Sequence, residues 1–287
     1  MKIFVLTKRN IITAAICLVL AVSVGAVSIL GLTKTQETAE SERIIPIYNV
    51  DCGDKKVVSI SFDAAWGNEQ TEDLLNILDE KNVKATFFLV GDWVEKYPDS
   101  VKKIAAAGHD IGNHSSTHPK MTELSRDKMM EEIENCNSLI KNLTGKEVTL
   151  FRPPYGDYNN SVVETVNSCG MYCVQWDVDS LDWKDPTAQD MVDRIKSKIC
   201  PGSIILMHNG ATNTPEALPM IIDAVREMGY ELVPISELLL KCDYTTDHKG
   251  TMIPAETEAK TESTTAETTK ETTKKKKPWF KSHGFIL

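Results

Sequence analysis

The sequence predicts an α/β protein with a parallel sheet, folded either as a barrel or as a doubly wound sheet. Two observations predict this class. Apolar, β-branched runs alternate with amphipathic helical segments from residue 57 to residue 241, which is the pattern of strand–helix units. Polar side chains that are able to do chemistry follow the ends of several of these runs. With 287 residues, 41% of them hydrophobic, the chain has ample material for a core.

Each predicted unit is a short apolar strand followed by an amphipathic helix. The first unit joins the strand Val57–Phe62 to the helix Thr71–Asn82, whose leucines share one face. Ser125 is a suitable N-cap for the longest helix, and Gly145 is a suitable stop. The other predicted elements are, in order, strand 85–90, helix 98–107, strand 109–114, helix 125–143, strand 148–154, helix 160–169, strand 171–180, helix 187–198, strand 203–208, helix 214–228, strand 230–236 and a last helical turn 237–241.

Five segments are predicted along the chain. Residues 1–10 are a basic cytoplasmic N-terminus, and the uncharged run 11–32 behind Lys2, Lys8 and Arg9 is long enough to anchor the chain in a membrane. A cleaved signal peptide is the alternative, but its apolar core usually spans only about 7–15 residues. Residues 33–54 are a polar stalk, residues 55–242 the folded domain, and residues 243–287 a disordered tail rich in Thr, Glu and Lys. The folded domain is therefore expected outside the cytoplasmic membrane.

The charge of the chain excludes one class of partner. Asp and Glu number 41 against 32 Lys and Arg, which gives a net charge of −9. Nucleic-acid binding depends on basic patches that neutralise phosphates. We therefore expect no nucleic-acid partner.

Chemically capable side chains stand at the ends of successive predicted strands. They are Asp63, His114, Arg152, Asp179 and His208. In parallel barrels and doubly wound sheets, functional sites lie at the carboxyl ends of the strands, so these groups are expected to meet. If these positions served only to pack the core, acids, imidazoles and a guanidinium would not be expected at the ends of so many strands.

Each of these residues also has a structural alternative. Asp63 can cap the following segment, Arg152 can belong to a Pro-Pro bend, and His208 can be a hydrogen-bonded core histidine. His114 and His118 are spaced four apart in HSSTH, a spacing at which two imidazoles can share one metal ion. Taken together at one end of the strands, the five groups favour a functional site.

In order and spacing, these stretches resemble the motifs of the polysaccharide deacetylases, the carbohydrate esterase family 4 group with the NodB homology domain. The resemblance covers residues 55–240, and it implies a distorted (β/α) barrel. It also implies hydrolysis of N- or O-acetyl groups on sugar polymers with a divalent metal, often zinc. The first motif of that family is Thr-Phe-Asp-Asp-Gly, which falls on residues 61–65. Asp63 matches the general base, whereas Ala64 stands where the family has a metal ligand, as in sporulation deacetylases of the PdaB type.

The resemblance also implies a role for residues of the other motifs. By this resemblance, His114 and His118 bind the metal, Arg152 orients the base, and the backbone N–H of Tyr155 faces the oxyanion. His208 is the general acid, and Asp182 supports it. Trp183 forms a wall of the substrate groove, and Leu206 shapes the acetyl pocket. Zinc that has lost one carboxylate ligand is expected to bind more weakly.

Three outcomes are open for the metal, and three for the function. Asp63 can shift onto the metal, a nearby acid such as Asp92 or Asp157 can replace the missing ligand, or the site can lack metal altogether. The leading hypothesis is a membrane-anchored, extracytoplasmic hydrolase that removes N-acetyl groups from cell-wall peptidoglycan or a related amino sugar, with sporulation as its setting. The alternatives are a catalytically silent glycan-binding protein and an O-acetyl esterase.

Overall fold

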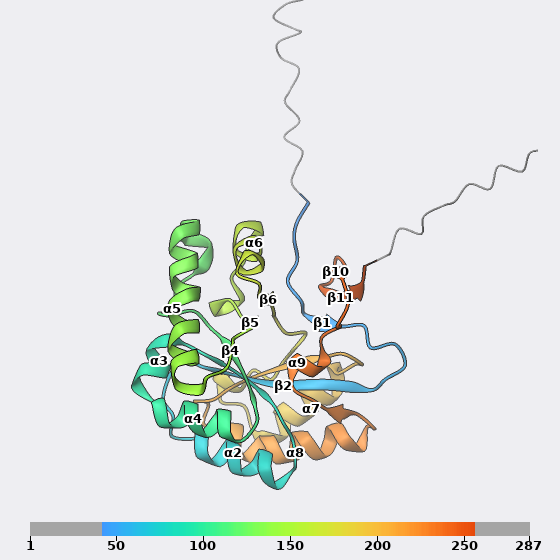
Figure 1. Cartoon of the computed structure of the whole chain (residues 1–287). Helices are drawn as coiled ribbons and strands as arrows, with labels where there is room; N and C mark the ends of the chain where they lie inside the picture. Colours follow the sequence, from blue (N-terminus) through green and yellow to red (C-terminus); the bar gives the residue numbers. More distant parts are fainter. Residues whose placement is uncertain (1–41, 256–287) are drawn as a thin grey trace, which may run out of the picture. The chain divides into compact units, whose positions relative to one another are not determined.

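The computed structural model describes residues 42–255 (Figure 1). The chain divides after Pro254 into two units, and every element below belongs to the first. The predicted anchor, residues 11–32, lies outside the described residues, as does most of the predicted tail. Within the described residues, no helix has the length and apolar character needed to cross a membrane.

An eight-stranded sheet forms the centre of this unit. Its strands are paired in the order β6-β5-β4-β3-β2-β8-β7, with β9 paired to β2 beside this path, and every pairing is parallel. The sheet curls, and in the described part of the chain β6 and β7 are its two edge strands, which do not pair with each other. The predicted distorted (β/α) barrel is therefore confirmed, as a barrel that is not fully closed. The strands are β2 (Val57–Ala64), β3 (Thr86–Leu89), β4 (Asp110–Asn113), β5 (Leu150–Phe151), β6 (Tyr172–Cys173), β7 (Val178–Asp179), β8 (Ile204–His208) and β9 (Glu231–Leu232).

Helices cover the outer side of the sheet. Contacts between neighbours run in the order α7, α8, α2, α4, α5 and α6, which follows the order of the strands around the sheet (Figure 1). Ser125 caps α5 by accepting from the N–H of Lys128, and Gly145 ends this helix with a left-handed φ of 70°, as the sequence predicted. The helices are α2 (Thr71–Glu80), α3 (Gly91–Lys96), α4 (Pro98–Ala106), α5 (Arg126–Thr144), α6 (Asn160–Ser168), α7 (Ala188–Lys198), α8 (Thr214–Glu227) and α9 (Ile235–Leu238).

The central strand β2 is buried on both faces, and its two faces differ in chemistry. Ile60, Phe62 and Ala64 alternate along one face and belong to the main apolar core. Ser61 and Asp63 alternate along the other face, toward the interior of the barrel. An apolar outer face against the helices and a polar inner face near the strand end therefore follow from the two-residue period of the strand.

The ends of the folded part differ from the prediction. Residues 42–54 were expected in a stalk and residues 243–254 in a disordered tail. Instead, β1 (Asn49–Val50), β10 (Tyr244–Thr246) and β11 (Thr251–Pro254) form a three-stranded sheet in the order β1-β11-β10. Val50 and Met252, which are paired across β1 and β11, are both almost fully buried. The folded part is longer than predicted because these few apolar residues bury against each other, a signal too short to detect beside the polar tail.

The predicted strand 171–180 is in fact two strands on opposite edges of the sheet. β6 pairs with β5, whereas β7 pairs with β8. Between them the chain crosses the opening of the barrel, and Val174 makes an isolated bridge to Ile47. A single apolar run in the sequence concealed this crossing.

Candidate active site

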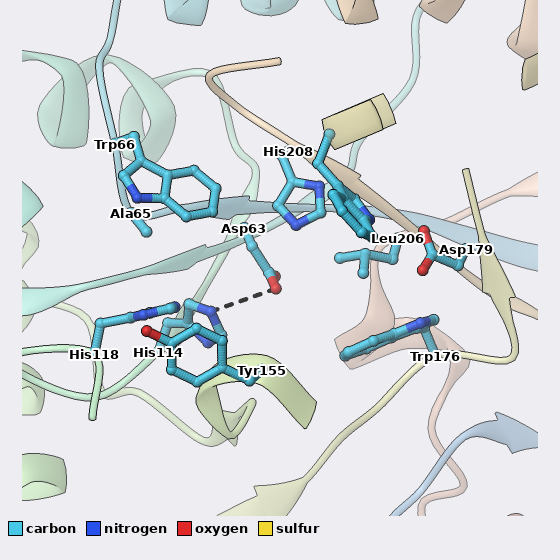
Figure 2. Close-up of a pocket in the computed structure, with 11 residues that line it drawn as sticks. Asp63, Ala65, Trp66, His114, His118, Tyr155, Trp176, Asp179, Leu206 and His208 are labelled. Atoms are coloured by element: carbon cyan, nitrogen blue, oxygen red, sulfur yellow. Dashed lines mark ion pairs between the residues drawn. The ribbon is translucent and has the colours of Figure 1, made fainter. Parts of the chain in front are cut away.

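A pocket of about 400 Å³ lies at the carboxyl ends of the strands (Figure 2). Two of its residues are neighbours by register, since Asp63 of β2 pairs with His208 of β8. Side chains paired in this way on adjacent parallel strands project to the same face, so sheet geometry alone brings the acid and the imidazole together. The lining residues are Asp63, Ala65, Trp66, His114, His118, Tyr155, Trp176, Asp179, Trp183, Leu206 and His208.

Asp63 is fixed by a fully buried arginine. Arg152 follows β5, and its Nη1 donates to Oδ1 of Asp63 at 2.7 Å. Its Nη2 donates to the hydroxyl of Ser61 at 2.9 Å and to the carbonyl of Gln175 at 3.1 Å. Burial raises the pKa of Asp63, but Arg152, followed by the nearby histidines, outweighs burial and holds that pKa below its usual value. Asp63 is therefore an ionised carboxylate at neutral pH.

His208 is fixed by a buried carboxylate. Its Nδ1 donates to Oδ1 of Asp182 at 2.7 Å, and its backbone N–H donates to Oδ2 of the same residue at 2.6 Å. Thr214 donates its hydroxyl to that second oxygen at 2.8 Å, which locks the carboxylate. Burial lowers the pKa of His208, but Asp182, followed by Asp63 and Asp179, more than compensates and raises it above its usual value. With Nδ1 engaged, Nε2 is the nitrogen left to exchange a proton.

The two predicted metal-binding histidines lie on the opposite side of the pocket. Nδ1 of His114 donates to the carbonyl of Arg152 at 2.7 Å, so Nε2 faces the pocket, 3.4 Å from Oδ2 of Asp63. The ring of His118 lies with its centroid 4.9 Å from that of His114. Burial lowers the pKa of His114, and burial together with His114 lowers the pKa of His118 to about 4. Both imidazoles are therefore neutral, the form that binds metals.

The residues present do not complete the metal site that the resemblance implies. Across residues 42–255, no group of three or more His, Cys, Asp or Glu side chains is arranged to hold a metal ion. Ala64 lies on the helix-facing side of β2, within the apolar core and outside the pocket lining. Neither acid considered as a replacement lines the pocket: Asp92 is exposed, and Asp157 accepts two hydrogen bonds from Thr122. A catalytic zinc usually has three protein ligands, and the described residues bring together only the two imidazoles that the sequence predicted, without a third ligand.

Three exposed aromatic side chains rim the pocket. Trp66, Tyr155 and Trp183 are 58%, 65% and 54% exposed, although large aromatic side chains are usually buried. The ring of Trp66 lies 6.0 Å from that of His208 and 6.2 Å from that of His118. Flat apolar surfaces around a polar floor suit a sugar ring, which presents C–H groups on its faces and hydroxyls at its edge.

The loops around the pocket hold residues in strained backbone conformations. Within the described residues, six non-glycine residues have positive φ, and all but Asn82 lie in these loops. They are Ser115 and His118 after β4, Tyr155 after β5, and Leu181 and Asp185 after β7. Such conformations cost on the order of 1–3 kcal/mol each and cluster at functional sites. The strain supports a role for this end of the sheet.

All nine residues selected from the sequence meet at this pocket. Asp63, His114, His118, Tyr155, Trp183, Leu206 and His208 line it, whereas Arg152 and Asp182 stand fully buried behind Asp63 and His208. The chemical roles assigned to them stay predictions.

Sequence reasoning left several site residues out. Trp66 and Trp176 were not selected as site residues, and Asp179 was noted only as an acid ending a strand. Trp66 stands three positions after Asp63 at the same strand end, which is the signal that was available. Trp176 lies in the crossing between β6 and β7, which the sequence did not reveal.

The chain is similar to known proteins along most of its folded part. The polysaccharide deacetylase family profile matches residues 51–174. The uncharacterized protein YlxY of Bacillus subtilis is 38% identical over 70% of this chain and 62% of its own length. The peptidoglycan-N-acetylglucosamine deacetylase of Bacillus cereus is 33% identical over 64% of this chain and 68% of its own length.

The chain belongs to the polysaccharide deacetylase family. Members of this family are hydrolases that act on N-acetyl groups. A solved structure of BA3943 from Bacillus anthracis, described as a carbohydrate esterase family 4 pseudoenzyme, matches with a TM-score of 0.65 and 39% identity over 67% of this chain and 68% of that one. A BA3943 mutant with restored enzymatic activity matches equally well, at 40% identity. The chain thus resembles a protein described as a pseudoenzyme as well as relatives named as deacetylases. It spans about three fifths of the length of YlxY.

Proposed function

We propose that this protein removes N-acetyl groups from an amino sugar of cell-wall peptidoglycan. One observation carries the proposal. Asp63 and His208 are paired across β2 and β8 in one pocket, and each is held by its own buried partner, Arg152 or Asp182. The family, the B. cereus relative and the aromatic rim around these two groups support a cell-wall glycan as the partner.

The two groups supply the proton transfers that amide hydrolysis needs. Asp63, which Arg152 keeps ionised, accepts the proton of the attacking water. His208, whose pKa is raised by its contact with Asp182, donates a proton to the departing nitrogen. The backbone N–H of Tyr155, the position that the family resemblance assigns to the oxyanion, stabilises the tetrahedral intermediate. Leu206, which is paired with Ser61 beside Asp63, gives the acetyl methyl an apolar surface.

Acetate release from N-acetylated peptidoglycan strands tests this proposal. We expect Asp63→Asn and His208→Ala to lower the rate at least about 100-fold, since a positioned acid or base contributes roughly 10²–10⁴-fold. Asp193→Asn removes one exposed charge from α7 and is expected to leave the rate unchanged. Full activity in both Asp63→Asn and His208→Ala would contradict the proposal. O-acetylated glycan, tested in parallel, distinguishes an amidase from the alternative esterase.

A second candidate function is glycan binding without turnover. Ala64 favours it, because the position that carries a metal ligand in the family is an apolar residue packed into the core. The likeness to BA3943, described as a pseudoenzyme, supports the same candidate. If it is correct, the wild-type chain binds glycan and releases no acetate with any divalent metal, whereas Ala64→Asp releases acetate when zinc is added.

The cellular setting is part of the proposal. We propose that residues 11–32 anchor the chain and place residues 42–255 outside the cytoplasmic membrane, on the support of the uncharged run behind Lys2, Lys8 and Arg9. Membrane fractionation with external protease tests this, and an N-terminal mass that lacks residues 1–32 would show a cleaved signal peptide instead. The sporulation setting is supported only by the resemblance of residues 61–65 to the PdaB type. Expression confined to vegetative cells would contradict it.

A further inference from the structure

We propose that His109 is an acid-sensitive switch at the amino-terminal edge of the sheet. The neutral imidazole holds the chain before β3 to the start of β4, and the protonated imidazole releases it. His109 directly precedes β4, whose other end leads into His114 of the pocket. The switch therefore lies at the opposite end of the sheet from the candidate active site, and it is independent of the proposed function.

A backbone hydrogen bond fixes which nitrogen of His109 carries the proton. The N–H of Ala85 donates to Nδ1 of His109 at 3.2 Å. Because a backbone N–H can only donate, Nδ1 has no proton, and the proton of the neutral ring is on Nε2. A second proton has to bind at Nδ1, where the N–H of Ala85 already points. Protonation therefore breaks this hydrogen bond and sets two N–H groups against each other.

The other ring nitrogen gives the protonated form no compensation. His109 is 1% exposed, and among the residues that the structure describes no hydrogen-bond partner reaches its Nε2. A buried imidazolium needs an acceptor for each of its two N–H groups, and an N–H left without one costs free energy. The described residues supply neither acceptor, so the fold favours the neutral ring.

The charged groups around His109 add to this preference. Burial is the largest effect, and together with Lys84, just before β3, it lowers the pKa of His109 to about 4. Asp79 of α2 favours the charged form, whereas Lys146, in the loop after α5, disfavours it. Glu147 lines a cavity of about 90 Å³ together with His109. The acids near the ring do not outweigh burial and the two lysines.

Asp110, the neighbour of His109, joins the same edge to α9. Its Oδ2 accepts from the hydroxyl of Thr86 at 3.3 Å and from the N–H of Ser236 at 2.8 Å. Its Oδ1 accepts from the hydroxyl of Ser236 at 2.9 Å. The start of β4 is thus a junction of three elements, and the contact of His109 with Ala85 is the part of it that a proton on the imidazole breaks.

Acidification is therefore expected to weaken the folded state through this residue. The pKa of His109 is lowered in the folded chain, whereas a histidine in an unfolded chain titrates near about pH 6.5. Between about pH 6.5 and pH 4 the unfolded chain binds more protons, so the stability that neutral His109 contributes is present above this range and is lost as pH falls through it. From pH 7 to pH 4, the unfolding equilibrium constant should rise about 100-fold for this reason.

Urea denaturation of the full chain between pH 7 and pH 4 tests the switch. His109→Asn keeps an acceptor oxygen near the position of Nδ1 but cannot take up a proton. We expect the unfolding constant of the wild type, divided by that of this variant, to rise about 100-fold from pH 7 to pH 4. His248→Asn makes the same change at an exposed histidine between β10 and β11, and the corresponding ratio should stay within about twofold.

Two measurements on the folded wild-type chain do not depend on how the variants fold. NMR of the ring proton on Cε1 should show His109 taking up its proton well below about pH 6.5. Hydrogen exchange should show that the protection of the Ala85 amide falls from pH 7 to pH 4, while the amides of β8 stay protected.

A wild-type to His109→Asn ratio that does not change with pH would overturn the inference. A His109 ring that titrates near pH 6.5 in the folded chain would also overturn it, as would an Ala85 amide equally protected at pH 4 and at pH 7. None of these results bears on glycan binding or acetate release, so each would leave the proposed function standing.

Discussion

His114 and His208 lie on opposite sides of one pocket, and both donate through Nδ1 over 2.7 Å, yet their partners differ. His114 donates to the neutral carbonyl of Arg152, and burial lowers its pKa. His208 donates to the carboxylate of Asp182, and its pKa is raised in spite of burial. The partner atom, rather than the histidine, therefore decides in which direction the pKa of each ring moves.

This difference divides the pocket into two halves. In the half with His208 and Asp182, both oxygens of Asp182 accept hydrogen bonds, and Nε2 of His208 is left to exchange a proton. The half with His114 and His118 offers two neutral nitrogens, a metal-binding arrangement that lacks its third ligand. The described residues thus bring together the predicted acid–base pair and the two predicted metal ligands without a third, and mutations can alter each half separately.

The largest effect is expected on the His114 side, from Arg152→Met. The variant leaves Asp63 buried without a counter-charge, which typically costs about 3–5 kcal/mol of the free energy of unfolding. Urea denaturation measures this loss. The double variant Arg152→Met/Asp63→Asn removes both charges and is expected to recover a large part of it. A single variant as stable as the wild type would show that the ion pair does not hold this half together.

The next largest effect is expected from a variant that adds a third possible metal ligand beside His114 and His118. Ala64→Asp places a carboxylate in an apolar, almost fully buried position, so without zinc we expect a loss of about 2–4 kcal/mol. If the new carboxylate joins His114 and His118, zinc at a hundred times its Kd should restore about 2.7 kcal/mol. Ala217→Asp, at a buried alanine of α8, is the matched control and should not respond to zinc. No zinc-dependent recovery in Ala64→Asp would mean that the half has diverged beyond one substitution.

The smallest effect concerns the His208 half. Asp182→Asn removes the main group that raises the pKa of His208, so this pKa should fall, as followed by NMR of the ring proton on Cε1. Because the folded-state pKa is raised, the contribution of the pair to stability is fully present below about pH 6.5 and is lost as pH rises through the folded pKa. We expect the variant to lose about 1–2 kcal/mol at pH 5 and less at pH 8. A loss that does not change with pH would contradict this account.

Local signals in the sequence predicted much of the fold and the position of the site. Ser125 and Gly145 mark the ends of α5 as predicted, because capping depends on neighbouring residues only. Asp63, His114, Arg152 and His208 meet as predicted, because parallel strands end at one edge.

Features that depend on distant pairing were not predicted. The break between β6 and β7 is set by partners on opposite edges of the sheet, which the run 171–180 does not encode. Trp176 lines the pocket because it lies in the segment between β6 and β7. The outward direction of Ala64 likewise follows from the regular pairing of β2 with β3, in which its partner is Leu89.

The small sheet that joins β1 to β11 has a consequence for the order in which the protein folds. Its parallel partners, Asn49 with Thr251 and Val50 with Met252, lie about 200 residues apart, a separation that carries a high loop-closure cost. During synthesis on the ribosome, Ile47 and Val50 emerge early but cannot be covered until nearly the whole chain has followed. We therefore infer that this sheet closes last and opens first, so that the backbone amides of residues 47–51 exchange with solvent before those of β2.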